Sequence, residues 1–225
     1  MPGDGRYGAA MNDGLNLKPR LRGVLHQWAF VVFVGLAVLL IALASGAKER
    51  AGAATFAGAL VAMFGTSAVY HRVNWRSFAA RMWLRRVDHA MIYVLIAGTY
   101  TPFALLALEG AWRWTILSVV WAGALAAIVV VLAWVDAPKW LSAALGIVLG
   151  WVGIVMVPEL LDAIRPHGLV LLAAGGVLYT FGAIVYARRR PDPVPTVFGY
   201  HEVFHACVIA AAACQYAVVA MLVAS

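Results

Sequence analysis

Two histidines four residues apart, His201 and His205, open the last apolar segment of the sequence. On a helix, positions i and i+4 lie on one face about one turn apart, which is the spacing that a single metal ion needs. With Glu202 between them, the pair also matches the HExxH pattern of zinc metallopeptidases, in which the glutamate is the general base. Residues 206–225 contain no His, Asp or Glu. Because two imidazoles do not make a stable zinc site, a third ligand must come from an earlier segment.

The segments that must position these histidines are apolar and long. Of the 225 residues, 64% are hydrophobic and only 12% are charged, compared with about 25% charged residues in soluble domains. Runs long enough to cross a bilayer, about 17 to 25 residues, occur seven times. They cover residues 24–44, 52–70, 90–108, 114–135, 140–157, 169–187 and 197–223.

These runs show no strand-type alternation, and a lipid-exposed backbone must close its own hydrogen bonds, so they are expected to be helices. The sequence predicts an all-α fold, a bundle of seven transmembrane helices. Residues 1–22 are expected to be a flexible cytoplasmic tail, and residues 23–225 a single seven-helix membrane domain. The segment 72–87 is expected to be a loop along the lipid headgroups, with the third helix beginning at Asp88. Gly175 and Gly176 predict close helix packing.

The basic residues lie unevenly on the two sides of this bundle. Thirteen of the 17 Lys and Arg residues fall on the side of the N-terminus and four on the other side. The four are Lys48, Arg50, Arg113 and Arg165. By the positive-inside rule, the N-terminus is cytoplasmic and the C-terminus lies outside, in a multi-pass protein of the cell membrane. The net charge of +7 is confined to loops, whereas a nucleic-acid binder concentrates basic charge on a soluble face, so nucleic acid is not an expected partner.

Ionisable residues inside membrane spans are costly and indicate functional sites. They are His71, Asp88, His89, His201 and His205. The charge count places the end of the second helix and the starts of the third and seventh on the cytoplasmic side, so these residues are expected at the same depth. His26, one turn into the first helix, is interpreted as a packed or interfacial residue and not as a ligand. For the others, the alternative is a set of interfacial histidines with Asp88 paired to a loop arginine.

Three neutral imidazoles and a water are the ligand set of a catalytic zinc. In such a site Asp88 could hold or deprotonate the water. Ser67 precedes His71 by four residues and shares its helix face. Its hydroxyl could therefore hydrogen-bond to the water, to a ligand imidazole or to a developing oxyanion.

Three motifs together resemble the hemolysin III family. They are Ser67-x-x-x-His71 followed by Asp88, the segment from Leu84 to Phe103 with Gly98-Thr99-Tyr100-Thr101-Pro102, and Gly199-Tyr200-His201-Glu202-Val203-Phe204-His205. This family is the bacterial branch of the progestin and adipoQ receptors, which include the adiponectin receptors and are related to the alkaline ceramidases. The resemblance implies a zinc ion held by His71, His201 and His205, with Asp88 and Ser67 around the bound water. Relatives carry Glu or Gln at the position of Glu202, which weakens the peptidase interpretation. The large N-terminal region of the adiponectin receptors has no counterpart here, so the resemblance does not extend to hormone signalling.

Three functions remain open. The first is a zinc-dependent intramembrane hydrolase of acyl amide or ester bonds in a membrane lipid, ceramidase-like, with its site in the cytoplasmic leaflet of the bilayer. The second is a non-enzymatic hemolysin III-type cytolysin or a sensor of membrane homeostasis, with a structural zinc. The third is an intramembrane metallopeptidase that uses Glu202. The sequence does not identify a lipid substrate or a protein partner.

Overall fold

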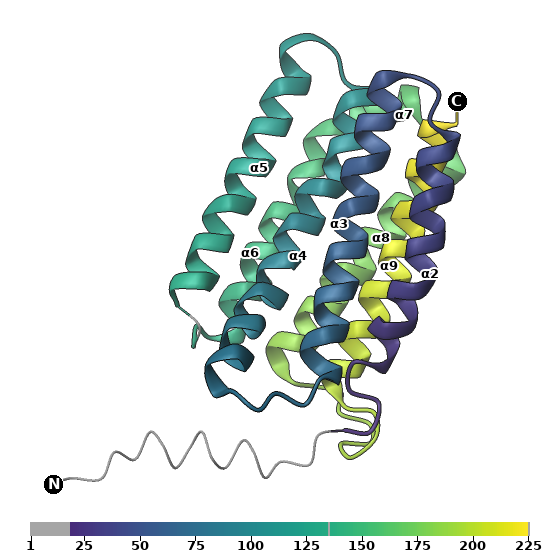
Figure 1. Cartoon of the computed structure of the whole chain (residues 1–225). Helices are drawn as coiled ribbons and strands as arrows, with labels where there is room; N and C mark the ends of the chain where they lie inside the picture. Colours follow the sequence, from purple (N-terminus) through teal and green to yellow (C-terminus); the bar gives the residue numbers. More distant parts are fainter. Residues whose placement is uncertain (1–18, 135, 225) are drawn as a thin grey trace, which may run out of the picture.

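The computed structural model describes residues 19–134 and 136–224, which form a bundle of helices without a β-strand in this described part (Figure 1). Seven spans are long and apolar enough to cross a membrane, as the sequence predicts. Six of them are single helices, and the fifth is divided into α6, a 3-10 turn η1 and α7. The bounds are α2 Val24–Leu43, α3 Ala47–Arg72, α4 Phe78–Ala107, α5 Gly110–Ala133, α6 Lys139–Trp151, η1 Val152–Met156, α7 Val157–Ala163, α8 Pro166–Arg188 and α9 Tyr200–Val223.

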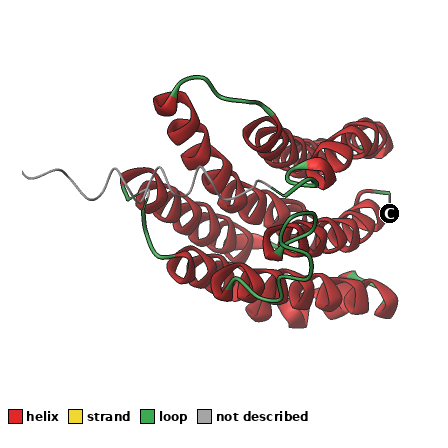
Figure 2. Ribbon diagram, turned by 90° about the horizontal axis from the view of Figure 1, so that it is seen from below, coloured by secondary structure: helices red, strands yellow, loops and turns green. Residues whose placement is uncertain are grey.

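Successive spans run in opposite directions, so α2, α4, α6 and α9 begin at the end of the bundle where α3, α5 and α8 finish (Figure 1). We call this the arginine-rich end, after Arg22, Arg72, Arg81, Arg85 and Arg188. The last helix, α9, packs against α2, α3, α4 and α8. The view along the bundle shows the helices lying side by side (Figure 2). The first residues of α9 therefore face the last residues of α3 and the first half of α4.

The bundle turns its apolar side chains outward as well as inward. The spans α3, α4 and α9 are buried along about half of their length, whereas less than a third of α2, α5, the α6–α7 span and α8 is buried. Exposed apolar residues include Val38, Leu125, Val148 and Val170, each 62% to 70% exposed. A soluble monomer rarely exposes such extensive apolar surface. The outer surface of this bundle is therefore suited to lipid chains.

Part of the predicted tail is in contact with the bundle. Residues 1–18 lie outside the described residues. Arg20 and Leu21 donate backbone hydrogen bonds to the carbonyl groups of Thr196 and Val197, at 3.0 Å and 3.1 Å. The segment just before α2 thus lies against the loop that leads into α9, and this contact connects the first span to the last.

The expected loop at residues 72–87 is wrong for most of its length, because α4 begins at Phe78. Ser77 caps this helix, with its hydroxyl accepting a hydrogen bond from the backbone N–H of Ala80 at 3.3 Å. A serine N-cap supplies an acceptor for a helix N–H that has no partner within the helix. As a result, Asp88 lies ten residues into α4 and is held by a continuous helix, rather than by the end of one.

The prediction of close packing at the glycine pair holds for one member. A Cβ added at Gly175 would lie 2.8 Å from Nε2 of Gln215 and 3.4 Å from the carbonyl oxygen of Ala211, so α8 and α9 pack closely at this glycine. A Cβ added at Gly176 would meet nothing within 4 Å.

The direction of the bundle in the membrane remains a prediction, which two reporter fusions can test. We expect a reporter inserted in the 73–77 loop, at the arginine-rich end, to be active only in the cytoplasm, and one fused after Ser225 only outside. The reason is the excess of Lys and Arg at that end. The opposite result for the loop reporter would place the histidines on the outer side of the membrane. A normally expressed but untagged chain is the control for the background of both reporters.

Candidate metal centre

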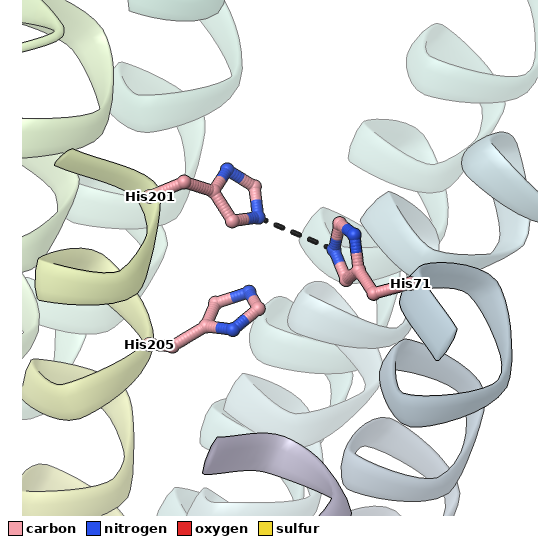
Figure 3. Close-up of side chains that lie close together, drawn as sticks. All are labelled: His71, His201 and His205. Carbon is pink, nitrogen blue, oxygen red and sulfur yellow. Dashed lines mark hydrogen bonds between the residues drawn. The ribbon is translucent and has the colours of Figure 1, made fainter. Parts of the chain in front are cut away.

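Three imidazoles from two helices converge near the arginine-rich end. One nitrogen from each of His71, His201 and His205 can be chosen so that the three lie within 4.8 Å of one another. The Nε2 atoms of His71 and His201 are 3.2 Å apart, and all three residues are buried (Figure 3). His71 comes from the last turn of α3, while His201 and His205 come from the first two turns of α9. The structure thus brings together the three histidines that the resemblance implies.

The start of α9 is defined by side chains around Gly199. The carboxylate Oε2 of Glu202 accepts a hydrogen bond from the backbone N–H of Gly199 at 2.9 Å, and Oδ1 of Asp192 accepts one from Tyr200 at 2.7 Å. These contacts satisfy backbone N–H groups at a helix start, where no partner within the helix exists. They fix the first turn of α9, so that His201 and His205 present their rings on the same face.

His71 is held by a close approach of α2 to α3. Gly23, the residue before α2, has φ 79° and lies against His71, where an added Cβ would clash with the Cβ of the histidine. Both the positive φ and the lack of space require glycine at this position. The glycine therefore allows the first span to pack directly on the histidine of α3.

A carboxyl group and a hydroxyl group stand beside the imidazoles. Oδ2 of Asp88 lies 3.6 Å from Nε2 of His71, and Asp88 is only 8% exposed. Ser67, one turn before His71 on α3, is buried and lines the same cavity as Asp88. Both residues thus lie beside the histidines, and the roles that the sequence assigns to them at a bound water remain predictions.

A fourth imidazole, that of His26, lies in the cluster as a packed residue, and the sequence did not predict its contacts with His205 and Ser67. Its ring stacks on that of His205, with centroids 3.6 Å apart and planes 11° apart, and its Nδ1 lies 2.8 Å from Oγ of Ser67. His26 is 2% exposed. It holds the ring plane of His205 and the hydroxyl of Ser67 in place. The signal that could have found it was its depth, because one turn into the first span is the same level as the start of α9.

Glu202 is occupied by structural contacts. Its side chain is fully buried and accepts a hydrogen bond from Nε of Arg22 on one oxygen and from Gly199 on the other. A residue one position after His201 leaves the helix about 100° away from that histidine's direction. Glu202 thus joins the segment before α2 to the start of α9, and both of its oxygens have partners other than the histidines.

His89, a further suspect from the sequence, faces a different neighbour. Its Nε2 lies 3.4 Å from the hydroxyl of Tyr186 in α8. The ligand group found among the described residues does not include it. As the residue after Asp88 on α4, it points about 100° away from the direction of the aspartate.

The cluster fits a zinc ion in ligand type and spacing. Two nitrogens bound at about 2.0–2.1 Å to one tetrahedral zinc lie roughly 3.3 Å apart, close to the 3.2 Å between the Nε2 atoms of His71 and His201. All three side chains are buried, and neutral imidazole nitrogens are ordinary zinc ligands. In the part of the chain that the structure describes, this is the one such ligand group found.

The cluster opens into an apolar cavity of about 470 Å³. Asp88, His201 and His205 line one end of it, and the other end is lined by residues from the far half of the bundle, among them Leu169 and Gln215. The walls come mostly from α4, the α6–α7 span, α8 and α9. Small-molecule sites are typically apolar cavities of about 300–1,000 Å³ with a few polar groups. The arrangement is therefore a polar, histidine-rich centre at the end of a cavity of a size to hold an apolar chain.

The fold and this centre define a multi-pass membrane protein with a buried group of histidines contributed by two spans. The sequence matches the haemolysin-III related family over residues 15–216, and the chain belongs to this family. It is 31% identical to the hemolysin-3 homolog of Bacillus subtilis (strain 168) over 194 residues, which cover 86% of each chain. It is also 40% identical to hemolysin-3 of Bacillus cereus over 104 residues, which cover 46% of this chain and 48% of that relative.

Proposed function

We propose that this protein is a zinc-dependent hydrolase that cleaves an acyl amide or ester bond of a membrane lipid. One observation carries the proposal: three buried imidazoles, with a carboxyl and a hydroxyl group beside them, stand at one end of an apolar cavity inside a membrane bundle. A lipid has the matching shape, because its polar bond lies at the interface and its chains extend into the bilayer. The site would lie in the cytoplasmic leaflet, at the arginine-rich end.

The ligands of the zinc would be His71, His201 and His205. When bound, zinc polarises a carbonyl oxygen and makes a hydroxide nucleophile accessible at neutral pH. Asp88 would accept the proton of the attacking water at Oδ2, the oxygen beside His71. Ser67 would hold the Asp88 carboxylate by a hydrogen bond, and His26 would hold Ser67 in turn. This chain of contacts fixes the base relative to the ligands.

The cavity would hold the acyl chain and keep bulk water from it. Its wall beside the histidines carries aromatic groups such as Phe204 and Tyr186, and further along it mixes aliphatic side chains with aromatic ones such as Tyr100. Burial of an apolar chain is favourable by about 25 cal/mol per Å² of area. The chain would thus supply binding energy that places its carbonyl group at the metal centre.

Metal removal tests the proposal directly. We expect purified protein in lipid nanodiscs to release fatty acid from an acyl-amide or acyl-ester lipid, to lose this activity after chelation, and to regain it with one equivalent of zinc. The released fatty acid is measured by mass spectrometry. Protein that was chelated and then given magnesium is the control, since magnesium prefers oxygen ligands to imidazole. Activity that persists without metal, or no turnover with zinc restored, would contradict the proposal.

A second candidate, a membrane-lysing protein with a structural zinc, is favoured by a different observation. Two similar proteins from Bacillus carry the names hemolysin-3 and hemolysin-3 homolog. In this case the zinc would only stabilise the bundle. Leakage of a dye from vesicles by chelated protein, with no lipid turnover by zinc-loaded protein, would support this candidate over hydrolysis.

The peptidase alternative has weaker support, because Glu202 is engaged with Arg22 and Gly199. A peptidase would need this carboxylate free to reach water at the metal centre.

A further inference from the structure

Two polar side chains line the apolar cavity far from the histidines, and each has a buried atom without a partner. They are Gln215 of α9, whose Oε1 has no hydrogen-bond partner, and Tyr179 of α8, whose hydroxyl has none. Gln215 is 6% exposed. Buried polar atoms almost always have a partner in the protein or in ordered water. Two such atoms in one cavity mark a place where the polar group of a ligand, or a water, could bind.

The two residues lie on neighbouring turns of the α8–α9 contact. A Cβ added at Gly175 of α8 would lie 2.8 Å from Nε2 of Gln215, so this glycine and Gln215 face each other. Tyr179 follows Gly175 by one helical turn, so it lies on the same face of α8. Gln215 follows His205 by ten residues on α9, which places it roughly 15 Å further along the helix axis at about 1.5 Å per residue. The polar pair thus lies well away from the metal centre.

A plain alkyl chain would fill this cavity but leave both atoms unpaired. A chain with one hydroxyl group at that depth would pair them, because a hydroxyl both donates and accepts. Its O–H would donate to Oε1 of Gln215, and its oxygen would accept from the O–H of Tyr179. A water molecule could pair the same atoms, but an apolar chain in the cavity would have to displace it or end short of it.

We propose that the cavity binds an acyl chain with a hydroxyl group near its middle, and that Gln215 and Tyr179 select it. The inference rests on the proposed function in one respect, which is that the carboxyl or acyl carbonyl end lies at the histidines. It adds a substrate class to that function, namely lipids with a mid-chain hydroxy acid.

The test compares two free fatty acids of equal length, stearic acid and 12-hydroxystearic acid, as competitors of a fluorescent fatty acid on the full-length protein. The measured quantity is the ratio of the two dissociation constants, stearic over hydroxystearic. We expect this ratio to fall about tenfold in Gln215→Met and in Tyr179→Phe, since an unpaired buried polar atom costs a free energy of this order. Comparing each variant with the native protein cancels the intrinsic difference in solubility between the acids.

Both variants should bind plain stearic acid as well as the native protein or better, which shows that they are folded. Thr99→Val is the matched control, because Thr99 also lines the cavity but its hydroxyl already donates to the carbonyl of Leu95 at 2.8 Å. The positional control is 2-hydroxystearic acid, whose hydroxyl lies at the carboxyl end. The ratio of the dissociation constants of stearic acid and 2-hydroxystearic acid should not change in either variant.

An unchanged ratio for 12-hydroxystearic acid in both variants would overturn the inference and assign the two atoms to water. If the ratios for the 2-hydroxy and the 12-hydroxy acid change equally, the inferred position of the hydroxyl group in the middle of the chain is wrong. Free acids contain no bond to hydrolyse, so the outcome does not depend on turnover. If lipid hydrolysis fails and the ratio still falls, the hydroxy-chain site stands and only the proposed function is lost.

Discussion

Purified protein should carry about one zinc per chain, and His201→Ala or His205→Ala should lose most of it. Each substitution removes one of three imidazoles, and two do not hold zinc stably. Because bound metal stabilises the folded state by linkage, the variants should also unfold at a lower temperature. Loss of a ligand present at 100 times its dissociation constant costs about 2.7 kcal/mol. Elemental analysis and thermal unfolding in the same detergent measure both effects.

Two histidines provide matched controls for this experiment. His89 lies near the centre but contacts Tyr186 and is not among the three ligands. His167, in the first turn of α8, is exposed at the opposite end of the bundle. Alanine at either position should leave the zinc content unchanged. A full equivalent of zinc in both His201→Ala and His205→Ala would show that the metal, if any, is bound elsewhere.

Asp88→Asn should retain most of the zinc and lose lipid hydrolase activity by a factor of about 100 or more, the usual scale for a general base. The amide keeps the shape of the side chain beside His71 but cannot accept a proton from water. Glu202→Gln should keep most of the activity per zinc-loaded molecule, because both Glu202 oxygens are bound by Arg22 and Gly199. It should instead lower thermal stability, since a buried charge pair loses one partner.

Both variants are assayed, zinc-loaded, against acyl-amide lipids and against a transmembrane peptide. Asp162→Asn is the control, because it makes the same chemical change at an exposed site in α7, at the other end of the bundle. It should behave like the native protein. An inactive Glu202→Gln together with an active Asp88→Asn would reverse the roles of the two carboxylates and support peptide hydrolysis. If neither the native protein nor the variants turn over lipid, and vesicles still leak in the absence of metal, the results support the cytolytic function.

The sequence by itself determined the seven spans and their helical nature. Long apolar runs form helices in lipid, because every backbone polar group must be hydrogen-bonded within the segment. The sequence also predicted that His71, His201 and His205 would lie at the same depth, and the resemblance to the hemolysin III family implied that they share one metal ion. Span counting puts the end of one helix and the start of another at the same level of the membrane, and the i, i+4 spacing puts two rings on one face. The structure brings these three together.

Only the tertiary structure decided which other groups surround them. A single sequence does not tell which face of α2 turns inward, so it predicted a packed or interfacial His26 but not that its ring stacks on His205. Likewise, Glu202 matches a catalytic pattern, but its neighbours in space, Arg22 and Gly199, make it a structural residue. The structure starts α4 just after the Ser77 cap. A single capping residue is a weaker signal in a sequence than hydrophobic periodicity, which placed the start of this helix ten residues later. Membrane depth is a one-dimensional property that the sequence encodes directly, whereas rotation about each helix axis is set by packing between helices that lie far apart in the chain.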